Sequence, residues 1–319
     1  GTYTMVNNYS AAQSDLLLAK LDTAGNFLSA ASFGGDSDEL ATSLAVTNNN
    51  ELIITGSFNS NTLVVGSYSF NASPNSKKSA VIIKTDAFAN VIWAKAIAET
   101  GGDIYACADL NGNIGITGEF WAPGIAVDGY SFSVTSSNIN GLVMKLSPAG
   151  NVLWADAIGS ANIPGEGCKS ATFGNIGDLI VTGFYSSSLA IGSYTLPGFQ
   201  NNKYVFVARY NSGGSVVDVL HSGSSASDVF STAILADPSG NIYLGGYFDG
   251  TQATFGAIQL ANPGTLESFY VARVGGQLTG LNEQTELNAV SIFPNPSRGG
   301  MQIDSGADPI QTIRVYNSL

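Results

Sequence analysis

The chain has 319 residues, of which 44% are hydrophobic and 11% are charged, and its formal net charge at pH 7 is −12. This composition argues against nucleic-acid binding, because phosphates require clusters of Lys and Arg, and the single histidine excludes a metal site built from several histidines. No run of about 18 apolar residues occurs, so we expect no transmembrane segment.

The first residues already belong to a repeating pattern. Residues 1–5 are similar to residues 66–70 and 192–196, since each segment is a Gly followed by an alternation of Tyr, Ser or Thr and apolar side chains. The sequence does not begin with the basic stretch and following apolar stretch that are typical of a signal peptide. We therefore expect an upstream portion that carries a signal peptide, with or without further repeats.

Three kinds of strand then follow in a fixed order. The first contains a basic residue near its end and lies near 16–22, 81–86, 142–147, 205–211 and 270–274. The second starts at Gly-Asn or a similar pair, near 25–33, 89–97, 150–158 and 214–221. The third lies near 41–46, 104–108, 169–173 and 231–236. The constant order indicates an internal repeat.

A tight turn with a fourth strand is the best preserved part of the repeat. Its copies span 47–58, 109–120, 174–185 and 237–248, and Gly56, Gly118, Gly183 and Gly246 recur every 62 to 65 residues. Asp or Asn begins the turn by bonding its own backbone, Gly supplies a positive φ, and the β-branched run predicts a strand. A shorter segment, near 68–70, 130–132, 194–196 and 258–260, ends each unit.

These segments together resemble the bacterial β-propeller repeat family over about residues 3–274. The resemblance implies an all-β fold: a β-propeller of four-stranded antiparallel blades, with four full repeats of about 63 residues and partial units at both ends. The partial units either combine into one composite blade or belong to a larger ring. Propellers host enzymes, lectins and scaffolds, so this likeness does not specify an activity.

Acidic residues recur at the junctions between the second and third strands of successive units. They are Asp36, Asp38 and Glu39, then Glu99 and Asp103, then Glu166, then Asp228. We expect them to gather on one rim, as solvated loop charge or as a site for calcium or a cationic partner. Paired carboxylates for glycoside cleavage are a further alternative. No junction has the oxygen ligands of a known calcium loop, so we expect no metal and no cofactor.

Other side chains allow both structural and functional interpretations. Trp121, Tyr185 and Tyr247 follow or end the fourth strand, and we predict that they are exposed and available as a carbohydrate platform. The recurrent basic residue either lines a channel or, as we favour, packs between blades and pairs near the rim; it is Lys20, Lys84, Lys145, Arg209 and Arg273.

Three further residue types receive structural interpretations. Trp93 and Trp154 occupy one equivalent position and are expected to pack between blades. His221, the single histidine, is expected to be non-catalytic. Cys107 and Cys168 are interpreted as small buried hydrophobes, with a disulfide between neighbouring blades as the alternative.

The repeat ends at Val274, after which residues 275–286 are polar and aperiodic and are interpreted as a linker. Residues 287–319 resemble an incomplete type A sorting domain of type IX secretion substrates, an Ig-like β-sandwich. The residues that carry this likeness are Phe293, Pro294, Asn295, Pro296, Gly299, Val315 and Tyr316. The likeness implies recognition by the type IX machinery and secretion to the outer surface of a Gram-negative cell. The chain stops at Leu319, before the last turn and strand of that pattern.

Three functional classes follow from these observations. The first is a secreted or surface-bound module without catalytic activity, for binding a carbohydrate or a surface protein, for adhesion, or for structure. The second is a glycan-active enzyme, a hydrolase or lyase, on the propeller scaffold. The third is a repetitive spacer for an upstream functional domain.

Overall fold

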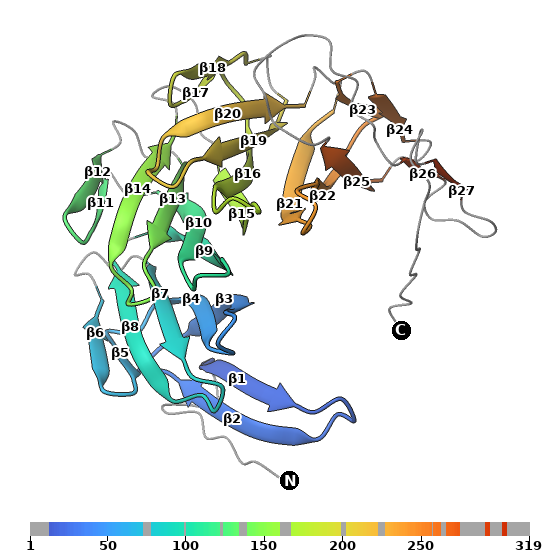
Figure 1. Ribbon diagram of the computed structural model, residues 1–319. Coiled ribbons are helices and arrows are strands. Elements are labelled where there is room, and N and C mark those ends of the chain that lie inside the picture. Colours follow the sequence, from blue (N-terminus) through green and yellow to red (C-terminus); the bar gives the residue numbers. More distant parts are fainter. Residues whose placement is uncertain are drawn as a thin grey trace.

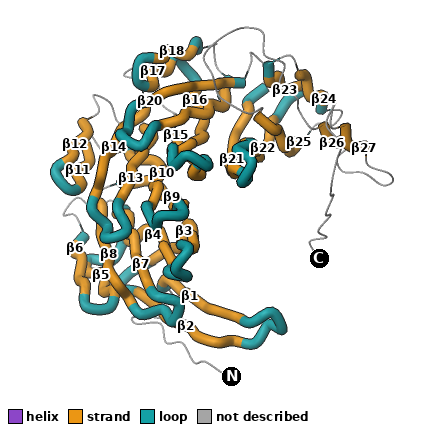
Figure 2. The backbone as a smooth tube through the Cα atoms, viewed as in Figure 1, coloured by secondary structure: helices purple, strands orange, loops and turns teal. Residues whose placement is uncertain are grey.

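The structure is a computed structural model that describes residues 13–72, 78–98, 100–121, 124–133, 139–159, 167–198, 202–222, 227–256, 258–262, 266–274, 291–293 and 302–304. These residues form antiparallel β-strands joined by turns, and none of them is helical (Figure 2). The prediction of an all-β fold is confirmed. Within this part of the chain, no helix is long and apolar enough to cross a membrane.

Three four-stranded sheets follow one another along the chain. The first sheet has the order β3 (Glu39–Val46), β4 (Leu52–Phe58), β7 (Ser79–Thr85), β8 (Val91–Ile97). The second sheet has the order β9 (Gly101–Ala108), β10 (Ile114–Phe120), β13 (Asn140–Leu146), β14 (Val152–Ile158). The third sheet has the order β15 (Gly167–Phe173), β16 (Leu179–Tyr185), β19 (Tyr204–Tyr210), β20 (Val216–His221).

Smaller sheets precede and follow these three. The leading pair is β1 (Leu16–Leu21) with β2 (Phe27–Phe33), and the fourth sheet is β21 (Val229–Ala236), β22 (Ile242–Phe248), β25 (Ser268–Val274). The four predicted sets of strands are present, but a set does not coincide with a sheet: within the described residues, three sheets have four strands. The reason is the strand pairing. The second strand of the first unit, β2, pairs only with β1 among the described strands, and β3 begins the next sheet, where β4 pairs with β7 of the following unit. One sequence unit thus contributes to two sheets.

A two-stranded hairpin separates the second and third strands of each sheet. The four hairpins are β5 (Thr62–Val65) with β6 (Tyr68–Asn71), β11 (Gly124–Val127) with β12 (Tyr130–Ser133), β17 (Leu189–Ile191) with β18 (Tyr194–Leu196), and β23 (Gln252–Phe255) with β24 (Ile258–Ala261). The short segment predicted at the end of each unit is the second strand of this hairpin. At the hairpin turn, Asp128 and Gly129 have φ of 46° and 83°, as a tight two-residue turn requires.

The sheets form an open arc, with β3, β9, β15 and β21 on its concave side and β8, β14 and β20 on its convex side (Figure 1). The repeat glycines make this packing possible. At Gly118 an added Cβ would lie 2.3 Å from the Asp103 carbonyl oxygen, and at Gly246 it would lie 1.9 Å from that of Phe230. Only glycine leaves room for the innermost strand at this point.

The turns that join paired strands share one design. The carboxylate of Asp109 accepts hydrogen bonds from the N–H groups of Asn111 and Asn113, at 2.9 and 2.7 Å, and Gly112 has a φ of 78°. Two backbone hydrogen bonds also close each turn: the N–H of the first residue donates to the carbonyl of the fifth, and the N–H of the fourth donates to the carbonyl of the first. They recur in the turns at 22–26, 47–51, 86–90, 109–113, 147–151, 174–178, 211–215 and 237–241. The hairpin turn predicted at 109–113 is confirmed, with its carboxylate occupied by backbone groups.

The core lies between successive sheets. Ile82 of the first sheet and Ile116 of the second are fully buried in one cluster, and Phe206 and Val143 join the third sheet to the second in another. Each such side chain contributes roughly 1.5–3 kcal/mol by burial. A sheet is therefore stabilised by its neighbours in the arc.

The tail contributes one further strand pair, β26 (Ser291–Phe293) with β27 (Gln302–Asp304). Of the residues that carry the sorting-domain likeness, Phe293 ends β26. Pro294, Asn295, Pro296, Gly299, Val315 and Tyr316 lie outside the described residues.

Candidate functional site

The concave face of the arc carries a polar hollow of about 500 Å³. The residues that line it come from the innermost strand of each sheet: Thr42, Ser43, Tyr105, Ala106, Lys169, Ser170, Ala171 and Thr232. The register of these strands explains the lining. One extra residue interrupts the pairing at Thr42, at Lys169 and at Thr232. A β-bulge re-aims the side chain at the interruption, and here all three bulged residues line the hollow.

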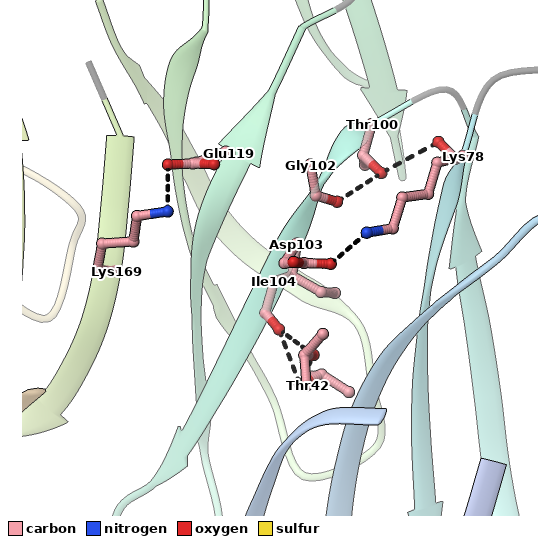
Figure 3. Close-up of polar contacts among 9 residues, drawn as sticks. Thr42, Lys78, Thr100, Gly102, Asp103, Ile104, Glu119 and Lys169 are labelled. Carbon is pink, nitrogen blue, oxygen red and sulfur yellow. Dashed lines mark hydrogen bonds and ion pairs between the residues drawn. The ribbon is translucent and has the colours of Figure 1, made fainter. Parts of the chain in front are cut away.

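Hydroxyl groups of the lining hold neighbouring sheets together. Thr42 Oγ1 donates to the Ile104 carbonyl oxygen at 2.5 Å, from the first sheet to the second (Figure 3). Ser170 Oγ accepts from the N–H of Ile234 at 3.2 Å, from the third sheet to the fourth. The innermost strands are thus joined by side-chain hydrogen bonds as well as by packing.

Two ion pairs also cross between sheets near this face. The Lys78 ammonium lies 2.6 Å from the Asp103 carboxylate, and the Lys169 ammonium lies 2.7 Å from that of Glu119 (Figure 3). The Asp103 and Glu119 side chains are 35% and 10% exposed. Each carboxylate is thereby already paired with a cation. Burial raises the pKa of Tyr105, which lines the hollow beside them.

The acidic residues predicted on the rim mostly bind the junction segments themselves. Asp36 accepts the N–H of Asn61 at 2.6 Å, Asp38 accepts that of Ser14 at 2.9 Å, and Asp228 accepts that of Lys203 at 2.8 Å. Asp38 and Asp228 occupy equivalent places, since the carbonyl of each accepts the N–H of the residue after the second strand. Glu99 and Glu166 lie outside the described residues.

Glu39 is the most buried of these carboxylates, at 1% exposure. It accepts the N–H of Gly35 at 2.9 Å and the hydroxyl of Ser60, while burial raises the pKa of Glu39. Among the residues that the structure describes, no group of three or more His, Cys, Asp or Glu is arranged to hold a metal ion. Asp36, Asp38, Glu39 and Asp228 thus each accept a backbone N–H at their junction.

The three predicted aromatic residues differ in exposure. Trp121 is 48% exposed, and Tyr247 is half-buried and stacks on Phe230 at a centroid distance of 4.8 Å. The expectation that Tyr185 is exposed is wrong, because it is fully buried. Tyr185 ends β16 at the place that Phe120 occupies in β10, where the ring points between sheets.

Three of the recurrent basic residues, Lys20, Lys84 and Lys145, connect a sheet to a turn of the next, as favoured from the sequence. Arg209 and Arg273 contact a turn of their own sheet instead. Lys84 Nζ lies 2.7 Å from Glu51 Oε2 and donates to the Pro148 carbonyl oxygen at 3.0 Å. Lys145 Nζ donates to the carbonyl oxygen of Gly177 at 3.1 Å. The packing prediction for the tryptophans is also confirmed, because the indole N–H of Trp154 donates to the Ser212 carbonyl in the next sheet at 3.1 Å.

The histidine and the cysteines show structural contacts. His221 Nδ1 lies 2.7 Å from the Ser222 carbonyl oxygen at the end of β20. Cys107 and Cys168 are free, so the alternative of a disulfide between neighbouring sheets is wrong. Burial raises the pKa of both thiols to about 12. The interpretation as buried hydrophobes is confirmed for Cys168, at 0% exposure, and Cys107 is partly covered.

Sequence reasoning missed a cluster of rings and cations between the third and fourth sheets. Phe184 and Phe230 meet edge to face at 5.4 Å, and the Lys203 ammonium lies 5.3 and 4.8 Å from their centroids. Lys169 lies 5.5 Å from the Phe184 ring. The available signal was a departure from the repeat, since Phe230 stands where the second sheet has Gly102.

No model of a known protein family matches this chain, and no curated protein matches it in sequence.

Proposed function

We propose that residues 13–274 form blades of a β-propeller that acts without catalysis, as a module for binding, adhesion or structure at the surface of a Gram-negative cell. The observation that carries the proposal is the hollow, which the innermost strands of four sheets line with hydroxyl groups and Lys169. Ligand sites are typically concave and contain a few fixed polar groups. The repeated strands form the scaffold, and the residue type at the bulged positions differs between sheets: Thr42, Lys169 and Thr232.

A glycan array tests this function with the purified chain. Thr232 is exposed in the hollow, so Thr232→Trp would fill it without entering the core. Ala190→Trp, on the exposed face of β17 in an outer hairpin, is the matched control. We expect binding to at least one glycan class, lost in Thr232→Trp and kept in Ala190→Trp. Equal binding by both variants would place the site elsewhere, and no binding to any glycan would favour a spacer.

A glycan-active enzyme is the second candidate, and it rests on Asp103 and Glu119, which lie on neighbouring strands beside the hollow. Each carboxylate is already paired with a lysine, at 2.6 and 2.7 Å, which favours a structural role over catalysis. Incubation with plant and algal polysaccharides, followed by measurement of new chain ends, tests the alternative. Cleavage that is lost in both Asp103→Asn and Glu119→Gln would replace the binding proposal with the enzyme.

Export by type IX secretion is part of the same proposal and rests on the sequence likeness of residues 287–319. Fusion of these residues to a reporter, expressed in a host with and without the type IX translocon, tests it. We expect the reporter outside the cell only when the translocon is present. A fusion that stays in the periplasm of both hosts would remove the sorting role and leave the binding role intact.

A further inference from the structure

Lys78 and Lys203 are equivalent residues at two junctions between sheets. Each immediately precedes the third strand of its sheet, β7 or β19. The carbonyl of Lys78 accepts the N–H of Gly101 at 2.9 Å, and that of Lys203 accepts the N–H of Val229 at 2.9 Å. In both cases the donor is the first residue of the innermost strand in the next sheet. The backbone fixes both lysines in the same place.

The surroundings of the two ammonium groups differ. Lys78 pairs with Asp103 at 2.6 Å. The residue equivalent to Asp103 is Ser231, whose hydroxyl donates to the Gly183 carbonyl at 3.1 Å. Lys203 takes part in none of the ion pairs formed by the described residues. Its charge lies instead over the faces of Phe184 and Phe230.

Aromatic rings continue outward from this lysine across the fourth sheet. Phe230 on β21 stacks on Tyr247 of β22 at 4.8 Å with an angle of 20° between the rings. Phe269 of β25 is the cross-strand partner of Tyr247 and is 56% exposed. At the corresponding places the second sheet has Gly102, Glu119 and Gly141, without a ring. Of these two sheets, as far as the structure describes them, the fourth therefore presents a row of rings beside a cation that forms no ion pair.

We propose that Lys203, Phe230 and Tyr247 bind a sugar ring that bears one anionic group, a carboxylate or a sulfate. The accessible parts of these half-buried rings would pack against the C–H groups of the sugar, and the ammonium would bind the anion through charge-assisted hydrogen bonds. The net charge of −12 opposes long polyanions, so the fitting ligand is a single acidic sugar on an otherwise neutral chain. This inference rests on the proposed binding function and names its ligand class.

Calorimetric titration of the whole chain tests the inference. The probes are a neutral oligosaccharide, the same chain ending in a uronic acid, its sulfated counterpart, a polyuronate and single-stranded DNA. We expect the singly acidic chains to bind at least about tenfold more tightly than the neutral one, the gain of one charged hydrogen bond. Equal affinity for the neutral chain, or tighter binding of the polyuronate or the DNA, would overturn the proposal. The two acidic chains tell whether carboxylate or sulfate is preferred.

Variants assign the effect to this site. Lys203→Met keeps the apolar stem and should lose the preference for the acidic chain, whereas Lys203→Arg should keep it. Tyr247→Ala should weaken the acidic and neutral chains alike, and Lys78→Met is the matched control with unchanged affinity. Unfolding midpoints close to that of the parent show that each variant is folded. If Lys203→Met keeps the preference for the acidic chain, the ligand class proposed here is wrong. The proposed binding function would still stand if Thr232→Trp abolishes all glycan binding.

Discussion

The junction between the first and second sheets and the junction between the third and fourth are built on the same backbone and serve different chemistry. At the first, Lys78 is neutralised by Asp103; at the other, Lys203 lies over two aromatic rings. The carbonyl of each lysine nevertheless accepts the same N–H from the next sheet. The comparison teaches that backbone contacts and buried rings hold the arc together, so the side chains at a junction are free to diverge. Four predictions test or sharpen it.

The largest effect is expected where both junctions depend on a buried ring. Phe120, at the end of β10, is 0% exposed, and Phe248 has the same place in β22 at 2%. Phe120→Ala should lower the free energy of unfolding by about 3–5 kcal/mol, because a cavity replaces the ring. Urea denaturation measures the loss. A loss below about 1 kcal/mol would show that the sheets do not depend on this packing.

The next effect concerns the opposite end of the strands, where a basic residue connects neighbouring sheets. Lys84 is 3% exposed, and its replacement by Met removes the cation beside Glu51 and one donor to the Pro148 carbonyl, which keeps the indole N–H of Trp93. We expect a loss of about 2–3 kcal/mol in the free energy of unfolding. Lys20→Met is the control, since exposed Lys20 makes a single long bond, 3.4 Å, to the Ala87 carbonyl. Equal losses in both variants would contradict the connecting role.

A smaller effect should follow from breaking the ion pair that distinguishes the first junction. Asp103→Asn removes the charge beside Lys78, but both side chains are about a third exposed, at 35% and 29%. Solvent screening limits the expected destabilisation to about 0.2–1 kcal/mol, and added salt should reduce it further. Thermal unfolding at low and high salt measures it. A cost of several kcal/mol would mean that the pair, rather than the backbone, holds the junction.

The smallest effect is expected from the turns that all sheets share. The amide of Asn90 holds the pKa of Asp86 below its usual value, through a hydrogen bond of 2.8 Å. A depressed folded pKa stabilises the protein above the unfolded pKa of Asp, and this stability is lost as pH falls through the folded value. The unfolding midpoint should therefore fall as the pH drops below about 4. Asp86→Asn should flatten this dependence slightly, and an identical profile would contradict the assignment.

The sequence indicated the parts of the fold that are local. Asp109 and Gly112 predict a hairpin turn on their own, and the strands beside it follow from the apolar pattern. Sheet boundaries were not accessible in this way, because the pairing of β4 with β7 spans a hairpin whose first strand, Thr62–Val65, was not recognised. The exposure of Tyr185 was misjudged, although Phe58 and Phe120 mark the same place in the repeat as apolar.

The candidate site depends on contacts between distant segments, which explains why the sequence predicted it only in part. Lys203, the residue before β19, reaches Phe184 and Phe230 from a position between them in the chain. Nothing in the local pattern around Lys203 distinguishes it from Lys78. The difference arises from what the neighbouring sheet places beside each lysine, Asp103 or Phe230, and both of these residues are distant from the lysine in the sequence.

Hydrogen–deuterium exchange with and without a singly acidic oligosaccharide tests most directly the claim that the two junctions have diverged in function. We predict that the ligand slows exchange in residues 203–206, 229–234 and 244–248, with exchange at 78–85 and 101–108 unchanged. Protection at the junction of Lys78 and Asp103, or equal protection at both junctions, would contradict the account.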